Sequence, residues 1–172
     1  MDELGRMDRE QFRSASKFPM IVLLDNVRSM HNVGSIFRSA DAFGIQELIL
    51  AGFTPKPPHR DIQKAALGAT ETVEWQSCND PRNLITDYKN NGFSIIALEQ
   101  TTNSTNIDQF VNQNSKPILL ILGNEVNGVS DELLALCDDV LEIPQHGTKH
   151  SLNVSVSAGI AMREILKSYL VQ

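Results

Sequence analysis

The sequence is most constrained by Ile118 to Leu122, five consecutive apolar residues that stop at Gly123, Asn124 and Glu125. A short unbroken apolar run is typical of a strand buried on both faces, and such strands belong to parallel sheets. A glycine followed closely by an acid cannot continue a buried strand. Because parallel sheets bind their ligands where the strands end, this point is a candidate ligand edge.

The rest of the chain alternates strand and helix signals. Apolar runs predict further strands at Met20–Leu24, Glu47–Ala51, Val73–Trp75, Phe93–Leu98 and Val140–Ile143, the last one buried and ended by Pro144. Amphipathic segments predict helices that begin near Asn32, Asp61, Pro81, Ser130 and Ser151. About six strands alternating with helices indicate a doubly wound α/β fold with right-handed crossovers.

Three helix boundaries can be read from single residues. Asn32 is the predicted N-cap of a helix that ends at Gly44. Ser130 is the predicted N-cap of a helix with two acids in its first turn. The last helix is expected from Ser151 to Leu170, because only Gly159 interrupts this segment.

Length and composition indicate one globular domain. A chain of 172 residues with 41% hydrophobic content can bury a proper core. We expect residues 1–19 to be a polar lead-in and residues 20–172 to be one domain. The charged N-terminus and the short apolar runs predict a soluble, cytoplasmic protein without a membrane span. Cys78 and Cys137 lack CxxC spacing and are expected to be reduced thiols.

The charge is unevenly distributed. Net charge is −6 overall, but it is +1 over residues 1–70, −9 over 71–142 and +2 over 143–172. A basic surface for a polyanion can therefore still form. Its candidate residues are Arg6, Arg9, Arg13, Lys17, Lys56, His59, Arg60, Lys64, His146, Lys149 and His150. The alternative for each cluster is a solvated face without a partner.

Several ligand classes are disfavoured by missing motifs. No Gly-x-Gly and no P-loop occurs, which argues against Rossmann dehydrogenases, NTPases and glycine-loop methyltransferases. His146 and His150 stand four residues apart and suggest a metal site with Asp138 or Asp139. Pro144 and Gly147 predict a loop there instead of one helical face, so no metal is expected.

Three motifs carry a family resemblance: Asn32-x5-Arg38, Gly123-x-Glu125-x2-Gly128, and Ser151-Leu152-Asn153-Val154-Ser155-Val156. In this order they resemble the motifs of the SpoU family of RNA 2'-O-ribose methyltransferases, within the SPOUT or trefoil-knot superfamily. The resemblance runs from about Ile21 to Leu170. It implies a parallel-sheet, Rossmann-like α/β domain with a C-terminal trefoil knot, S-adenosylmethionine as cofactor, an RNA substrate and a homodimer.

The resemblance also implies roles for single residues. The implied cofactor contacts are backbone groups at Leu122, Gly123, Asn124, Ile143 and Leu152. The implied catalytic residues are Asn32, Arg38, Glu125, Ser151 and Asn153, with Glu125 orienting Asn32 or the first loop. Arg38 would act as the base or as an electrostatic clamp on the developing alkoxide.

Each of these residues also has a structural interpretation. Ile143 and Leu152 could be core residues, and Glu125 a surface turn acid. Arg38 could pair with Asp41, while Ser151 and Asn153 could cap a helix. The rival function is a non-catalytic module that binds RNA or a small ligand. For the RNA itself, tRNA is slightly favoured over rRNA, because no separate RNA-binding domain precedes Ile21.

Overall fold

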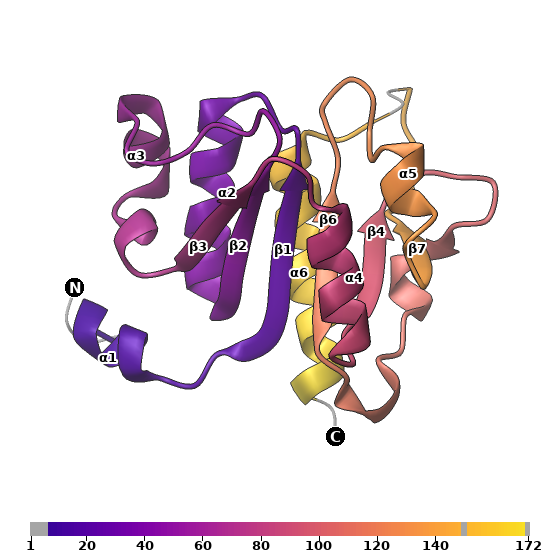
Figure 1. Ribbon diagram of the computed structural model, residues 1–172, viewed down its shortest axis with the longest axis horizontal. Coiled ribbons are helices and arrows are strands. Elements are labelled where there is room, and N and C mark those ends of the chain that lie inside the picture. Colours follow the sequence, from indigo (N-terminus) through magenta and orange to yellow (C-terminus); the bar gives the residue numbers. More distant parts are fainter. Residues whose placement is uncertain (1–6, 149–150, 171–172) are drawn as a thin grey trace.

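The computed structural model describes residues 7–148 and 151–170, which form one seven-stranded sheet with helices on both faces (Figure 1). The strand order is β3-β2-β1-β6-β4-β7-β5, and every neighbouring pair is parallel. The strands are β1 (Phe18–Asp25), β2 (Ile45–Ala51), β3 (Glu74–Cys78), β4 (Ser94–Leu98), β5 (Thr105–Asn106), β6 (Ile118–Leu122) and β7 (Asp139–Glu142). The predicted parallel α/β class is confirmed.

The helices form two layers around this sheet. They are α1 (Arg9–Ser14), α2 (Met30–Phe43), α3 (Arg60–Ala66), α4 (Arg82–Asn90), α5 (Asp131–Leu134) and α6 (Val154–Leu170). Short 3-10 turns occur at Ala69–Glu71 (η2), Ile107–Gln109 (η3) and Gln113–Ser115 (η4). One apolar cluster joins the sheet to α2, α3 and α6, and a second joins its other face to α4 and α5. The sheet is therefore the middle of three layers.

The central strands alternate their side chains between these two cores. In β6 the residues Ile118, Leu120 and Leu122 face the α2/α6 side, while Leu119 and Ile121 face the α4/α5 side. All five are fully or almost fully buried, which confirms the interpretation of this run. The same alternation in β1 places two strands at the centre of the molecule that are apolar on both faces.

A topological switch point lies between β1 and β6. From the carboxyl end of β1 the chain passes to α2 on one face of the sheet, whereas from β6 it passes to α5 on the other face. Connections that diverge in this way leave a crevice at the carboxyl edge, where open α/β sheets bind ligands. The loops after β1, β2, β6 and β7 meet at this edge, the upper side of Figure 1.

Of the predicted helix boundaries, the start of α2 was wrong, whereas its end at Gly44 and the start of α5 after Ser130 were right. The N-cap of α2 is Ser29, whose hydroxyl accepts a hydrogen bond from the amide of Asn32 at 3.3 Å. Asn32 lies one turn inside the helix, and its side chain is thereby left for tertiary contacts. Gly44 ends the helix in the left-handed conformation, as predicted. Ser130 does precede α5, but its side chain makes no capping hydrogen bond in the part of the chain described.

The C-terminal segment also differs from the expectation. Helix α6 begins at Val154 instead of Ser151, because Asn153 caps it: its side-chain oxygen accepts from the Ser155 amide at 2.9 Å. Ser151 and Leu152 therefore lie outside the helix, in the segment that leads into it. Strand β7 is less buried than predicted, with only Leu141 fully buried, because β7 lies between β4 and the two-residue strand β5 near the sheet's edge.

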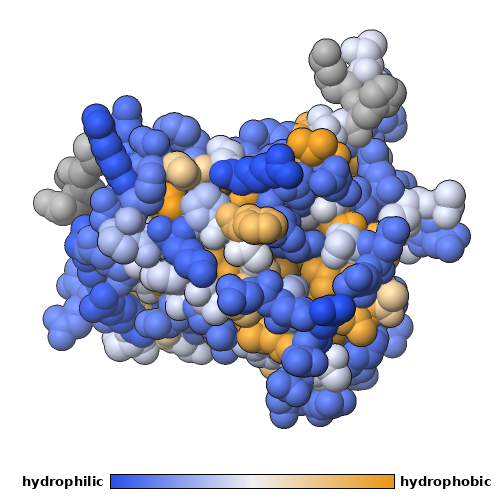
Figure 2. All heavy atoms as spheres, turned by 45° about the horizontal axis from the view of Figure 1, so that its top comes forward, coloured by the Kyte–Doolittle hydropathy of each residue, from blue (hydrophilic) through white to orange (hydrophobic). Residues whose placement is uncertain are grey.

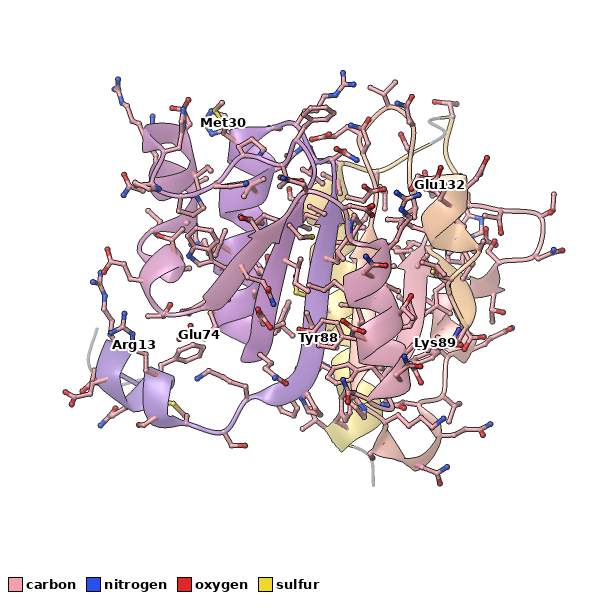
Figure 3. The ribbon with its side chains drawn as sticks, in the orientation of Figure 1. Arg13, Met30, Glu74, Tyr88, Lys89 and Glu132 are labelled. Atoms are coloured by element: carbon pink, nitrogen blue, oxygen red, sulfur yellow. The ribbon has the colours of Figure 1, made fainter. Side chains whose placement is uncertain are left out.

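Polar contacts tie the outer elements together. Two contacts hold helix α1 to η2. Arg9 forms an ion pair with Glu71, and the Arg13 guanidinium donates to the Glu71 backbone carbonyl. Lys89 and Glu132, labelled in Figure 3, mark the α4 and α5 layer, where Lys89 pairs with Asp138 at 2.6 Å. Cys78 and Cys137 are both free cysteines. No helix within residues 7–148 and 151–170 is long and apolar enough to span a membrane.

Candidate active site

The loop after β6 is folded tightly against its own strand. Asn124 and Gly128 pair across it, with each amide donating to the other residue's carbonyl at 2.9 Å. A Cβ atom on Gly123 would lie 2.1 Å from the carbonyl carbon of Gly128 and from the Val129 nitrogen. Only glycine allows the backbone to approach so closely, which is the physical reason for a glycine at this point of the motif.

Asn124 joins this loop to the end of β1. It is only 8% exposed, its side-chain nitrogen donates to the Asn26 carbonyl at 2.7 Å, and its side-chain oxygen accepts from the amides of Val126 and Asn127. All polar atoms of the amide are therefore used within the protein. We conclude that Asn124 shapes the edge of the sheet with its side chain.

Glu99, which the sequence reasoning missed, holds the loop from the other side. One carboxylate oxygen accepts from the Val129 amide and the other from the Gln100 amide, both at 2.9 Å. Gly128, in the left-handed conformation, lets this carboxylate approach, since a Cβ there would lie 2.1 Å from the Glu99 oxygen. The available signal was similar to the one used for Glu125: an acid close to the end of an apolar strand, here directly after β4.

Glu125 binds the start of α2 from the opposite side of the crevice. Its carboxylate accepts from the amides of Arg28 at 3.0 Å and Ser29 at 3.1 Å, and from the side-chain nitrogen of Asn32 at 2.9 Å. The resemblance implied a contact from Glu125 to Asn32 or to the loop after the first strand, and both contacts are present. Glu125 is therefore more than a solvated turn acid, although its residue as a whole is exposed.

These hydrogen bonds set the charge state of Glu125. Partial burial alone raises the pKa of the carboxyl group, but the hydrogen bonds from the Arg28 amide, the Asn32 side chain and the Ser29 amide outweigh it and lower the pKa below its usual value. The carboxylate is consequently ionised at neutral pH, and both oxygens are engaged. Such a group is a weak proton acceptor and a strong positioning contact.

Asn32 links Glu125 to the C-terminal motif. Its side-chain oxygen accepts from the side-chain nitrogen of Asn153 at 3.1 Å, while its nitrogen donates to Glu125. The oxygen of Asn153 is used by the amide and hydroxyl of Ser155, at 2.9 and 2.6 Å. Residues from three motifs, 93 and 121 positions apart, thus form one hydrogen-bonded row from Glu125 to Asn153.

A pocket of about 390 Å³ opens beside this row. It lies at the ends of β4, β6 and β7 and is closed by the segment before α6. Seven of the residues predicted from the sequence line it: Leu122, Gly123, Asn124, Glu125, Ile143, Ser151 and Leu152. Glu99, Glu142 and Gln145 also line it and were not predicted. Its volume falls in the range of small-molecule sites, about 300–1,000 Å³.

Arg38 is not part of this cluster within one chain. It lies six residues after Asn32, about 9 Å further along the helix, and lines a second hollow between α1, α2 and the turn after α3. Its side chain is exposed and forms no ion pair with any described residue, so the proposed pair with Asp41 was wrong. Asp41 instead accepts a hydrogen bond from the Thr72 hydroxyl.

Only part of the metal site considered from the sequence, His146 and His150 with Asp138 or Asp139, lies among the described residues. His146 is exposed, whereas His150 and Lys149 lie outside the described residues. Among the residues that the structure describes, no three His, Cys, Asp or Glu side chains gather in a way that could hold a metal ion.

A parallel doubly wound sheet, a pocket at its carboxyl edge and a polar row beside that pocket define an α/β enzyme domain with its ligand site at the carboxyl edge of the sheet. The class can be named more closely by comparison. Residues 19–163 match the SpoU rRNA Methylase family. The chain belongs to this family, and is thus a member of a family of RNA methyltransferases.

Individual relatives agree with this assignment. The chain is 33% identical over 151 residues to a tRNA (guanosine(18)-2'-O)-methyltransferase of Aquifex aeolicus, covering 84% of this chain and 67% of the relative. It is 27% identical to the 23S rRNA (guanosine-2'-O-)-methyltransferase RlmB of Vibrio parahaemolyticus, covering 98% of this chain and again 67% of the relative. The chain thus spans about two thirds of the length of these relatives.

Solved structures give the same result. The A. aeolicus TrmH/SpoU tRNA modifying enzyme superposes with a TM-score of 0.82 at 31% identity, covering 95% of this chain and 81% of that one. The AdoMet-bound rRNA methyltransferase of Sinorhizobium meliloti superposes with a TM-score of 0.81 at 29% identity, covering 95% and 60%.

The pocket fits the family's cofactor, S-adenosylmethionine. Its volume suits a ligand of this size, and apolar residues such as Leu122, Ile143 and Leu152 can wall off an adenine whose polar edge is read by backbone groups. The charged residues that line it are Glu99, Glu125 and Glu142, with no Lys or Arg among the described lining residues. Acids without cations suit a ligand that carries a sulfonium and an ammonium group.

Proposed function

We propose that this protein methylates a ribose 2'-hydroxyl in a structured RNA. The observation that carries the proposal is the hydrogen-bonded row Glu125–Asn32–Asn153, which brings all three motifs to the rim of the cofactor pocket. Two relatives with this domain are named for 2'-O-methylation of a guanosine, one in tRNA and one in 23S rRNA. We propose tRNA as the first class to test, because the tRNA enzyme shares the higher identity, 33% against 27%.

In the proposed reaction the bound S-adenosylmethionine supplies a methyl group on a positively charged sulfur. Pocket residues such as Leu122, Ile143 and Leu152 would hold the cofactor, and transfer of its methyl group to the ribose oxygen would leave the electron pair of the broken carbon–sulfur bond on the sulfur. The hydroxyl proton leaves to an acceptor at the site. The chain's own contribution is to hold the hydroxyl in line and to exclude water, and both depend on a rigid rim.

Glu125 and Asn32 serve this positioning. Because both oxygens of Glu125 are occupied and its pKa is lowered, we assign Glu125 to orienting Asn32 and the loop after β1, and not to proton transfer. Asn153 and Ser151 lie next to the pocket's mouth and are proposed to contact the ribose. Arg38 is proposed to stabilise the charge on the reacting oxygen, as the base or as a clamp.

The position of Arg38 supports a homodimer with shared sites. Within one chain Arg38 lies away from the pocket, so it can act on the reaction only if a second copy brings its own pocket to it. Helix α6 and the residues just before it offer a surface for such a contact, since Val156 in the helix is 50% exposed and Leu152 before it is 39% exposed. We further propose that α6 is threaded as the trefoil knot of the family, and that the protein acts in the cytoplasm on RNA.

Two measurements test the function in sequence. Calorimetry of the purified protein should show binding of both S-adenosylmethionine and S-adenosylhomocysteine. Incubation with labelled S-adenosylmethionine and total RNA from a cell that lacks the protein should place the label on a ribose 2'-oxygen, which nuclease mapping then assigns to tRNA or rRNA. Heat on binding without any transfer to RNA would favour the non-catalytic module, and label on a base or on protein would refute the chemistry.

A further inference from the structure

An exposed aromatic side chain stands at the carboxyl edge of the sheet. Phe53 follows β2 and is 89% exposed, more than any other large apolar residue among those described. Single exposed apolar side chains are common on protein surfaces and by themselves need no explanation. Three further observations distinguish Phe53: the rigidity of its backbone, the charge around it, and its position relative to the site.

The backbone under Phe53 is held by buried polar contacts. The Phe53 amide donates to the side-chain oxygen of Asn26 at 2.9 Å. The next residue, Thr54, is 2% exposed, and its hydroxyl donates to the Leu24 carbonyl at 2.9 Å and accepts from the Val27 amide at 3.1 Å. On the other side Gly52, with a positive φ, donates its amide to Cys78. The turn is anchored at every residue while the ring points outward.

Gly52 is required by this arrangement. A Cβ atom at position 52 would lie 2.2 Å from the Asn26 side-chain oxygen, the atom that receives the Phe53 amide. Asn26 itself adopts a left-handed conformation, and its side-chain nitrogen donates to Asp25 at 2.7 Å. A surface phenylalanine with no partner needs no such support. A ring that must present its face to a ligand does, because pre-ordering lowers the entropic cost of binding.

The surroundings of Phe53 are basic. Arg28, Lys56 and Arg60 are all exposed, and none of them forms an ion pair with a described residue. They lie in the loops that follow β1 and β2 or at the start of α3. Figure 2 brings this edge forward and shows apolar surface set among strongly hydrophilic side chains. Unpaired cations around an exposed aromatic ring are the combination that binds single-stranded nucleic acid.

Phe53 is also connected to the candidate active site. The side-chain oxygen of Asn26 accepts from the Phe53 amide, and the backbone carbonyl of Asn26 accepts from the Asn124 side chain at 2.7 Å. Asn124 in turn directly precedes Glu125 in the sequence. Strand β2 is two positions from β6 in the sheet, which places the two loops about 10 Å apart at a strand spacing of about 4.8 Å. That separation suits a neighbouring nucleotide rather than the target itself.

We propose that Phe53 is a stacking platform for an unpaired base next to the methylated nucleotide, with Arg28 and Lys56 contacting the adjoining phosphates. This inference rests on the proposed RNA substrate. It adds that the RNA is recognised through a base that is free to leave its helix, because a base within a duplex has no exposed face for a ring. The aromatic face, not its apolar character alone, is what the contact requires.

The test uses a ten-residue oligoadenylate with a fluorescent label, whose binding is followed by anisotropy at low salt. Phe53→Ala and Phe53→Leu should each weaken binding about tenfold or more, because stacking is lost in both. Phe53→Trp should retain the wild-type affinity. The matched control is Val111→Ala, since Val111 is 73% exposed but follows β5, which the sheet order separates from β2 by four strands; this change should have no effect.

The results that would overturn the stacking role of Phe53 differ from those that would overturn the proposed methyl transfer. Wild-type affinity in Phe53→Ala, or in Phe53→Leu, would overturn the stacking role even if the protein methylates RNA. A change of oligomeric state in Phe53→Ala, seen by light scattering, would assign the ring to a subunit contact and overturn it as well. Aromatic-dependent binding without any methyl transfer would support the platform while the proposed reaction fails. Unchanged calorimetric binding of S-adenosylmethionine in Phe53→Ala shows that the variant is folded.

Discussion

At the scale of single residues, Glu125 is defined by its hydrogen bonds more than by its exposure. Three donors converge on its carboxylate and lower its pKa, so the folded state favours the ionised form. In contrast, Arg38 is exposed and unpaired to any described residue, a state that leaves its guanidinium available for a substrate. Both residues were assigned to the active site from their motifs, but Glu125 is held by three hydrogen bonds whereas Arg38 is free to contact a substrate.

The lowered pKa of Glu125 predicts a pH-dependent stability. A carboxyl group whose pKa is lowered on folding stabilises the protein above its unfolded pKa of about 4.3, and this contribution is lost as the pH falls through the folded pKa. In Glu125→Gln the side chain has no titratable carboxyl group, so its stability lacks this pH-dependent contribution. Urea unfolding from pH 7 down to about 3 should therefore show the wild type losing its advantage over Glu125→Gln as the pH drops. Parallel stability curves would mean that the hydrogen bonds do not favour the ionised form.

Arg38 is predicted to act on the transition state and not on cofactor binding. Arg38→Ala should lower single-turnover methyl transfer by about two orders of magnitude or more, while calorimetry shows nearly unchanged S-adenosylmethionine affinity. Leu152→Arg, in the pocket wall, should instead weaken S-adenosylmethionine binding and abolish transfer through that loss. Arg38→Lys separates charge from geometry, because lysine keeps the charge but lacks the planar donor group. Full activity in Arg38→Ala on the mapped RNA would make Arg38 an ordinary surface residue.

At the scale of elements, two close approaches position the site. The first is the loop 123–128 against β6, which depends on Gly123 and on the Glu99 carboxylate. The second is α2 against α3, where a Cβ on Gly34 would lie 2.5 Å from the Ile62 carbonyl oxygen and 2.7 Å from the Ala65 Cβ. Because α2 carries Asn32 at one end and Arg38 further on, its seating on α3 determines where both point.

Gly34→Ala is therefore predicted to destabilise the protein. Alanine is intrinsically favoured over glycine within a helix by roughly 0.5–1 kcal/mol, but overpacking against a backbone carbonyl costs about 1–3 kcal/mol, so the clash should prevail. Gly159→Ala is the control, since its Cβ would meet only the Ser39 hydroxyl at 3.8 Å in α2. Urea unfolding should show a loss for the first change and no loss for the second. Equal stability of the two variants would contradict the close α2–α3 contact.

At the scale of the whole molecule, one chain forms the candidate cofactor pocket but places Arg38 in a different hollow. A homodimer resolves this separation if each pocket is completed by the Arg38 of the other copy. Light scattering at micromolar concentration should then give a mass near twice the 19.1 kDa of one chain. A monomer with full activity would show instead that Arg38 is not needed or that it reaches the pocket by a movement within its own chain.

Mixed dimers test the sharing directly. Arg38→Ala and Leu152→Arg chains, co-expressed with different tags, should each be inactive alone. If Arg38 acts across the interface, a mixed dimer has one complete site, and statistical mixing restores about one quarter of wild-type activity. If Arg38 acts within its own chain, each half of the mixed dimer is defective and no activity returns. Purification through both tags in turn isolates the mixed species.

Much of the fold could be predicted from local pattern, and the misses have physical causes. The apolar runs at Met20–Leu24 and Ile118–Leu122 predicted the central strands because burial on both faces leaves no other pattern. The start of α2 was misplaced by three residues because serine and asparagine are both good caps, and local preference does not choose between them. The same holds for the start of α6, where Asn153 rather than Ser151 supplies the capping oxygen.

Local patterns indicated the fold class and the order of the strands along the chain, because these depend on periodicity, and the three motifs were assigned by resemblance to a known family. Three features became known only from the folded chain: Asn32 bridges Glu125 and Asn153, Glu99 holds the loop, and Arg38 lies outside the pocket of its own chain. These contacts join residues roughly thirty to one hundred and twenty positions apart. Their geometry depends on which strands become neighbours and on the face each helix presents, and no local pattern carries that information.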